Sequence, residues 1–143
     1  MVAYTDDLKT FIPSIDEQHE ELLSLLNNVE IIGTAAHTKE ETEKALEFLG
    51  AYIEKHLSYE EELMVEYGYP EYSWHVNWHD GYINQFKNLK GEYAKNGPSP
   101  NFTHILTEFL MKWVITHIRN VDTDLGHYIR DHARYKNSRK ETL

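Results

Sequence analysis

Ligand-type side chains occupy positions of this sequence where a helix would otherwise bury apolar residues. In the first helical pattern His19 lies between Ile15 and Leu22, at spacings of four and three residues that are typical of a buried helix seam. Later seams contain further residues of this kind, namely His56, Glu60, His75, His79 and His117. A buried imidazole or carboxylate is costly unless it has a partner, so the fold must provide these side chains with one.

Gly, Pro and Asn cluster at three places and divide the chain into four helical segments. The breaks are residues 33–38, 68–70 and 96–101, and the predicted helices are 14–32, 38–67, 71–95 and a fourth from about 101. Short connections favour antiparallel neighbours. We therefore predict an all-α protein with a single domain, residues 1–143: an up-down-up-down antiparallel four-helix bundle (14–131) with an N-terminal arm (1–12) and a frayed polar tail (136–143).

Charge and composition exclude several classes of protein. The formal net charge is -10, and we expect neither nucleic acid nor a membrane as a partner, because both are bound chiefly through Lys and Arg. The chain has no cysteine, so any metal must be held by His, Asp or Glu. The first residues contain acids rather than the basic and apolar regions of a signal peptide, which predicts a cytoplasmic protein.

Two pairs of these side chains have a spacing that places both members on one helix face. His56 and Glu60 are four residues apart, as are His75 and His79. Residues at this spacing differ by only about 40° around the helix axis. Each pair can therefore point at one centre in the bundle core.

His117 and Asp122 have a less favourable spacing. They are five residues apart, which corresponds to about 140° on a regular helix. Both can reach one centre only if the helix ends, kinks or locally widens between them. We therefore predict a helix irregularity near residues 119–121.

Together these side chains predict a site for two metal ions. Five imidazoles and two carboxylates suit a borderline metal such as iron, and they outnumber the three or four protein ligands of a zinc site. The alternative is that each histidine is an ordinary core residue, since a single pair of such residues four positions apart is weak evidence for a metal site. The other histidines are predicted to lie at the surface: His37, His104, His127 and His132.

Four segments resemble the hemerythrins, and in particular the bacterial hemerythrin-like proteins. They are IDEQH ending at His19, HLSYEEELM from His56, YPEYSWHVNWH ending at His79, and WVITHIRNVD ending at Asp122. The likeness covers nearly the whole chain. It implies a domain that holds two iron ions (Fe2+/Fe3+) with a bridging oxo or hydroxo group.

The resemblance also implies how the candidate ligands divide between the two ions. Three histidines would ligate one iron, two would ligate the other and two carboxylates would bridge them: His75, His79 and His117; His19 and His56; Glu60 and Asp122. The second iron would keep an open position, where the family binds oxygen. Family alignment and seam position suggest as the lining of an oxygen pocket Leu22, Leu23, Tyr82, Trp113, Val114 and Ile118, with plain core packing as the alternative for each.

Tyr82 departs from the family pattern, in which an aromatic residue without a hydroxyl is usual. Its phenol could donate a hydrogen bond to bound oxygen or be oxidised there, which would shift the balance towards redox chemistry. The favoured alternative is that the hydroxyl bonds a backbone carbonyl.

Three functions are compatible with these features. The resemblance implies a binding protein, not an enzyme: an oxygen carrier, store or sensor, with molecular oxygen as its ligand and other domains of a longer signalling protein as further partners. The alternative is a di-iron oxidoreductase acting on peroxide, nitric oxide or oxygen, although a His-rich ligand set leaves few open positions. A structural or storage site would instead be fully coordinated and inert to oxygen.

Overall fold

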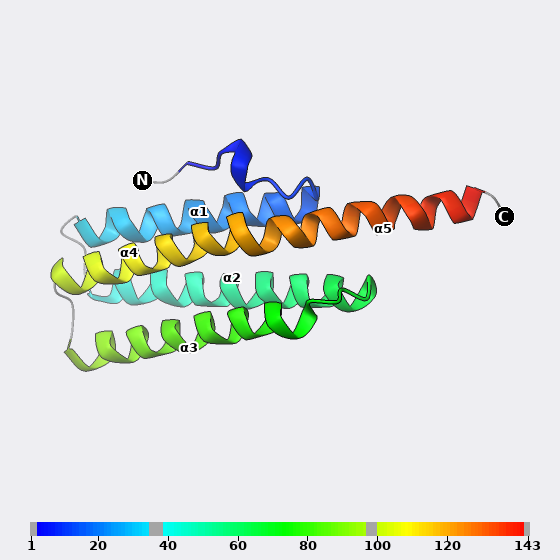
Figure 1. Cartoon of the computed structure of the whole chain (residues 1–143). Coiled ribbons are helices and arrows are strands. Elements are labelled where there is room, and N and C mark those ends of the chain that lie inside the picture. Colours follow the sequence, from blue (N-terminus) through cyan, green and yellow to red (C-terminus); the bar gives the residue numbers. More distant parts are fainter. Residues whose placement is uncertain (1–2, 35–38, 97–99, 142–143) are drawn as a thin grey trace.

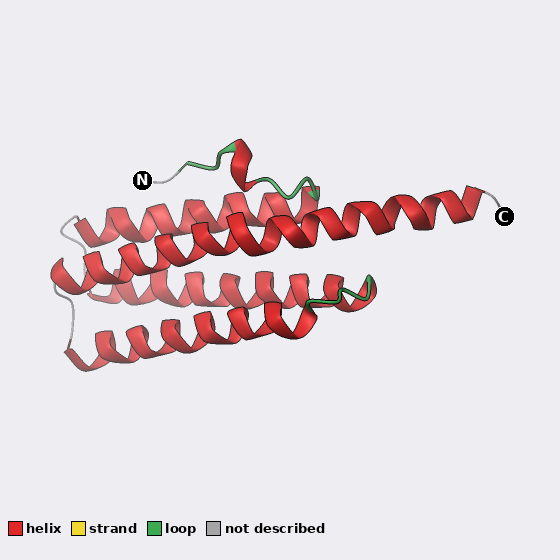
Figure 2. Ribbon diagram, in the orientation of Figure 1, coloured by secondary structure: helices red, strands yellow, loops and turns green. Residues whose placement is uncertain are grey.

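The computed structural model describes residues 3–34, 39–96 and 100–141, and every element in these ranges is helical (Figure 2). The elements are the 3-10 helix η1 (Asp6–Leu8), α1 (Pro13–Thr34), α2 (Lys39–Glu66), α3 (Tyr72–Asn96), α4 (Pro100–His117), the π-helical turn η2 (Ile118–Asp122) and α5 (Thr123–Glu141). None of the described helices is long and apolar enough to cross a membrane.

The helices form a closed bundle. α1 packs against α2 and α4, and α3 packs against the same two helices, so each helix has two neighbours. Figure 1 shows the chain running up and down through these four helices in turn. The predicted all-α four-helix bundle is confirmed.

The helix boundaries follow the predicted breaks closely, with one exception at the C-terminus. α4, η2 and α5 form one continuous rod whose last part extends beyond the other helices (Figure 1). Residues 136–141 of the predicted tail are part of α5, which continues to Glu141, and the fraying of this tail stays a prediction. Residues 133–141 contain neither Gly nor Pro, so nothing in this stretch interrupts a helical backbone.

Gly68 determines where α2 ends. Its φ of 61° is in the left-handed region, which glycine adopts without steric cost. The Tyr69 amide then donates to the Met64 carbonyl at 2.9 Å, as in a Schellman cap. This tight turn lets α3 return directly alongside α2.

The N-terminal arm packs outside the bundle as predicted and is fastened at two points (Figure 1). The Thr10 amide and hydroxyl both donate to Asp16 Oδ1 at 2.8 Å. Arg119 of η2 donates through Nε and Nη2 to Asp7 Oδ2 at 2.9 and 2.8 Å. The arm therefore contacts the π-helical turn directly.

Two apolar clusters fill the bundle, one towards each end. The larger contains Leu22 of α1 and Tyr82 of α3, and the smaller contains Ile15 of α1 and Met64 of α2. His19 lies between Ile15 and Leu22 along α1, and the other candidate ligands occupy the same level on their helices. The core thus surrounds the candidate site with apolar side chains on both sides.

Candidate metal centre

Seven side chains meet in the middle of the bundle, each with at most 3% of its surface exposed. They are His19 of α1, His56 and Glu60 of α2, His75 and His79 of α3, His117 of α4 and Asp122 of η2. These are the seven candidate ligands that the seam positions and spacings predict. The structure brings all of them into one cluster.

The π-helical turn explains how two side chains five residues apart reach this cluster. The Thr123 amide donates to the Ile118 carbonyl, which is an i→i+5 bond, and the Thr123 hydroxyl donates to the Arg119 carbonyl at 2.6 Å. The widened turn places Asp122 Oδ1 3.0 Å from His117 Nε2. The predicted irregularity is confirmed, and it is a π-helix without a break in the rod.

The donor atoms fall into two groups that share both carboxylates. Within each group the donor atoms lie within 4.8 Å of one another. One group has five members and the other has four: Glu60, His75, His79, His117 and Asp122; His19, His56, Glu60 and Asp122. Carboxylates shared between two sets of imidazoles are arranged to bridge two neighbouring cations.

Asp122 occupies the centre of the arrangement. Its Oδ2 lies 3.0 Å from His19 Nε2, and its Oδ1 lies 3.1 Å from His75 Nε2 and 3.0 Å from His117 Nε2. The oxygens of Glu60 face the imidazoles of α2 and α3 at 2.9 to 3.9 Å. A single aspartate thus contacts histidines of both groups.

The clustered side chains contain donor atoms that hydrogen bonds leave unsatisfied and that metal ions could coordinate. Among the described residues, six of the seven side chains have buried nitrogen or oxygen atoms without a hydrogen-bond partner: His19, Glu60, His75, His79, His117 and Asp122. Such atoms lose their hydrogen bonds to water on folding and normally form hydrogen bonds within the protein instead. Cations coordinated by these atoms would provide the missing partners.

Burial keeps three of the clustered histidines in the neutral form that can bind a metal ion. Burial lowers the pKa of His19, lowers that of His56 to about 4 and lowers that of His79 to about 2, so their imidazoles are neutral at pH 7. Burial, followed by the charge of Asp122, raises the pKa of Glu60 well above its usual value. Burial opposes ionisation of Asp122 as well, but the facing imidazoles outweigh it and hold the pKa of this carboxyl well below its usual value.

His56 is oriented by a contact outside the cluster. Its Nδ1 lies 2.7 Å from Gln18 Oε1, and a proton donated to this oxygen leaves the Nε2 lone pair facing the carboxylates. The hydroxyl of Tyr52, one turn earlier on α2, donates to the Gln18 carbonyl at 3.2 Å. Gln18 therefore joins α2 to α1 directly beside the candidate ligand His19.

Comparison with known proteins assigns this arrangement to a family. The model of the hemerythrin HHE cation-binding domain matches residues 10–129, a range that includes all seven clustered side chains. The chain belongs to the hemerythrin family. It is therefore a non-haem di-iron domain of a family whose members are generally oxygen carriers rather than enzymes.

Individual hemerythrins agree with this assignment. A bacteriohemerythrin of Stenotrophomonas maltophilia is 25% identical over 132 residues, which cover 92% of this chain and 84% of the relative. A bacteriohemerythrin of Aquifex aeolicus is 28% identical over 120 residues, 82% of this chain and 88% of the relative. The crystal structure of a wild-type hemerythrin superposes with a TM-score of 0.81 at 23% identity, covering 90% of this chain and 97% of the other, which supports the fold.

A small cavity adjoins the candidate metal centre. Its volume is about 10 Å³, roughly the space that one water-sized molecule needs. It borders three clustered side chains and seven others, most of them apolar: His56, His117 and Asp122; Leu22, Ile53, Leu57, Tyr82, Trp113, Val114 and Ile118. His56 belongs to the group that has one donor fewer.

The cavity lining differs from the predicted pocket at a few positions. Five of the six predicted residues border it, but Leu23 is buried in the larger apolar cluster and does not. Sequence reasoning missed Ile53 and Leu57, which lie one turn before His56 and directly after it. Their positions close to the predicted ligand His56 on the same helix could have indicated that they line the pocket.

The remaining histidines stay away from the centre. His104 is 76% exposed and lies 3.5 Å from Glu108, and His127 is exposed beside Arg130. His132 is half-buried, with Nδ1 2.9 Å from the Tyr128 carbonyl, and it is not part of the cluster. His37 lies outside the described residues.

Proposed function

We propose that this chain binds molecular oxygen reversibly, with two iron ions held by the seven clustered side chains. Three histidines would hold one iron, two histidines would hold the other and two carboxylates would bridge them: His75, His79 and His117; His19 and His56; Glu60 and Asp122. The bound ions would supply the redox electrons and the open coordination position that oxygen binding requires.

One observation carries the proposal: a small cavity adjoins both donor groups, through His56 of the group with fewer donors, His117 of the other group and the shared Asp122. An ion held by His19, His56 and the two shared carboxylates has one protein ligand fewer than its neighbour, and His56 and Asp122 border the cavity. A space of about 10 Å³ is close to what one water-sized molecule needs, so it is too small for an organic substrate. The surrounding apolar side chains exclude bulk water from the place where oxygen would lie.

Besides the candidate ligands, Tyr82 and Trp113 are the residues in the cavity lining whose side chains carry a polar atom. The ring of Tyr82 is 1% exposed, and among the described residues its hydroxyl has no hydrogen-bond partner. The predicted bond to a backbone carbonyl is therefore absent from the structure. Burial raises the pKa of this phenol, so the hydroxyl keeps its proton and can donate it in a hydrogen bond to oxygen in the cavity.

Replacing Tyr82 with Phe should have two opposite effects. The metal-free protein should gain about 1 kcal/mol in its free energy of unfolding, because a buried hydroxyl without a partner is removed. The iron-loaded protein should bind oxygen about three- to tenfold more weakly, because one hydrogen bond to the ligand is lost. Denaturant unfolding and an oxygen titration measure these two quantities.

Tyr52→Phe is the matched control. The Tyr52 hydroxyl donates to the Gln18 carbonyl at 3.2 Å, so its removal should lower the free energy of unfolding. A loss of stability in Tyr82→Phe comparable to that in Tyr52→Phe would show that the Tyr82 hydroxyl has a protein partner and is not available to oxygen.

The visible absorption spectrum of the iron-reduced protein tests the proposed function. The spectrum should change when oxygen is admitted under anaerobic handling, and it should return to its starting form when oxygen is removed. An irreversible change to the oxidised state would favour the alternative, a di-iron oxidoreductase. A spectrum indifferent to oxygen would identify a closed metal site. The cytoplasmic location and the attachment to signalling domains stay predictions.

A further inference from the structure

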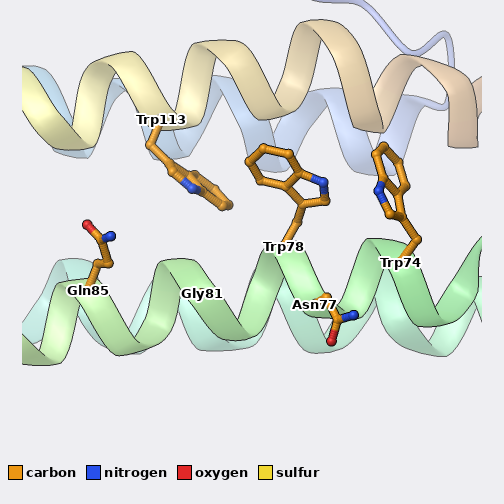
Figure 3. A pocket seen from close by; sticks show the side chains of 6 residues that line it. All are labelled: Trp74, Asn77, Trp78, Gly81, Gln85 and Trp113. Atoms are coloured by element: carbon orange, nitrogen blue, oxygen red, sulfur yellow. The ribbon is translucent and has the colours of Figure 1, made fainter.

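Three tryptophans form a line from the metal centre to the surface. The indole of Trp113 stacks on the imidazole of His117, with ring centroids 4.7 Å apart and planes inclined by 12°. The ring of Trp78 lies 6.4 Å from that of Trp113 and also 6.4 Å from that of His117, and the ring of Trp74 lies 6.2 Å from that of Trp78. Figure 3 shows the three indoles in a row between α3 and the rod opposite.

The outer end of this line is open to solvent. Trp78 is 38% exposed and Trp74 is 46% exposed, although large aromatic side chains are normally buried. Both border an open groove of about 440 Å³, whose lining is Trp74, Asn77, Trp78, Gly81, Gln85 and Trp113 (Figure 3). The outer tryptophans are therefore in direct contact with solvent, whereas the clustered ligands are at most 3% exposed.

The positions of the tryptophans on α3 follow from those of the candidate ligands. Trp74 directly precedes His75, and Trp78 directly precedes His79. One residue corresponds to about 100° of rotation, so the same four-residue spacing that directs both histidines into the core directs both indoles into the neighbouring groove. The line therefore starts beside the ligands and leads away from them.

Indole is suited to carrying single electrons in this place. Its π-system can lose an electron without first losing a proton, whereas a phenol must release its proton when it is oxidised. Tyr82 stacks on Trp113 with centroids 3.7 Å apart, but among the described residues its hydroxyl has no acceptor for a proton. Of the two rings that Trp113 contacts away from His117, Trp78 is therefore the better electron donor.

We propose that Trp113, Trp78 and Trp74 form a relay that carries oxidising equivalents from the metal centre to the surface of α3. Reduction of one hydrogen peroxide to two water molecules breaks its O–O bond and takes up two electrons and two protons. The relay would supply the two electrons one at a time: Trp113 gives up each electron, and Trp78 and then Trp74 replace it in turn. Trp74 releases its indole proton to water. A soluble one-electron reductant, such as an enediol or a thiol, returns one electron and one proton to Trp74 and is itself oxidised. The relay protects the ligands from oxidation.

Treatment of the iron-loaded protein with one equivalent of hydrogen peroxide tests this relay. Mass spectrometry of the peptides should find oxygen added mainly to Trp74 and Trp78 when no reductant is present, and ascorbate should suppress this addition. In Trp78→Phe the oxidation of Trp74 should be lost, and oxidation of Trp113 and His117 should increase.

The metal-free protein distinguishes the relay from direct attack on exposed rings. Trp74 should stay unmodified there under the same peroxide treatment, because no oxidised centre draws electrons from it. Equal oxidation of Trp74 with and without iron, or equal oxidation in Trp78→Phe and the unchanged protein, would overturn the proposal. The relay requires the metal centre but not reversible oxygen binding, so the two proposals fail independently.

Discussion

Replacing Asp122 with Asn should lower the iron content of the protein from about two ions per chain to below about one. Asp122 belongs to both donor groups and lies 3.0 to 3.1 Å from three histidines. Asparagine has nearly the same shape, but it removes one of the two negative charges in the cluster and replaces one donor oxygen with an NH2 group that cannot bind a cation. Both ions are affected, and metal analysis of the purified protein measures the loss.

The neighbouring acid Asp124 provides the matched control for this variant. Asp124 is exposed at the start of α5 and belongs to neither donor group, so Asp124→Asn should keep both ions. Circular dichroism should show the same helix content in the metal-free forms of both variants, because asparagine fits the space of the buried carboxylate. Full iron content in Asp122→Asn would contradict the assignment of this residue as a bridging ligand.

The bundle and the cluster could be predicted because they depend on regular helix geometry. A four-residue spacing puts His75 and His79 on one face whatever the rest of the chain does. The five-residue interval from His117 to Asp122 conflicts with a regular helix, and this conflict was itself the signal for the π-helical turn. The sequence therefore predicted both the regular helices and the irregularity between α4 and α5.

Contacts between side chains of different helices could not be predicted from the periodicity of the sequence. The partner of a hydroxyl depends on which carbonyl of another helix comes within 3.5 Å, and no periodicity reports that distance, so the free hydroxyl of Tyr82 was not predicted. The line of indoles was missed for a similar reason. Trp113 on α4 meets Trp78 on α3 only through the packing of two helices, and the ligand search gave no reason to pair them.

The metal-free protein should lose about 2 kcal/mol of its free energy of unfolding between pH 6 and pH 5. The pKa values of His19, His56 and His79 are all lowered in the folded state, to about 4 for His56 and about 2 for His79, from 6.5 in the unfolded chain. Below pH 6.5 the unfolded chain therefore binds protons at these three histidines more readily than the folded protein does, and stability falls as the pH falls. Glu60 opposes this trend, because its raised pKa lets the folded protein hold one proton that the unfolded chain releases above pH 4.5.

The net difference is about two protons, and denaturant unfolding of chelator-treated protein at several pH values measures its slope. His56→Gln removes one of the three histidine contributions and should roughly halve the slope, because about one net proton then remains. His104→Gln changes an imidazole that is 76% exposed and should leave the slope unaltered. A free energy of unfolding that stays constant between pH 6 and pH 5 would mean that the buried imidazoles accept protons in the folded state. The cluster would then not hold its histidines neutral for metal ions.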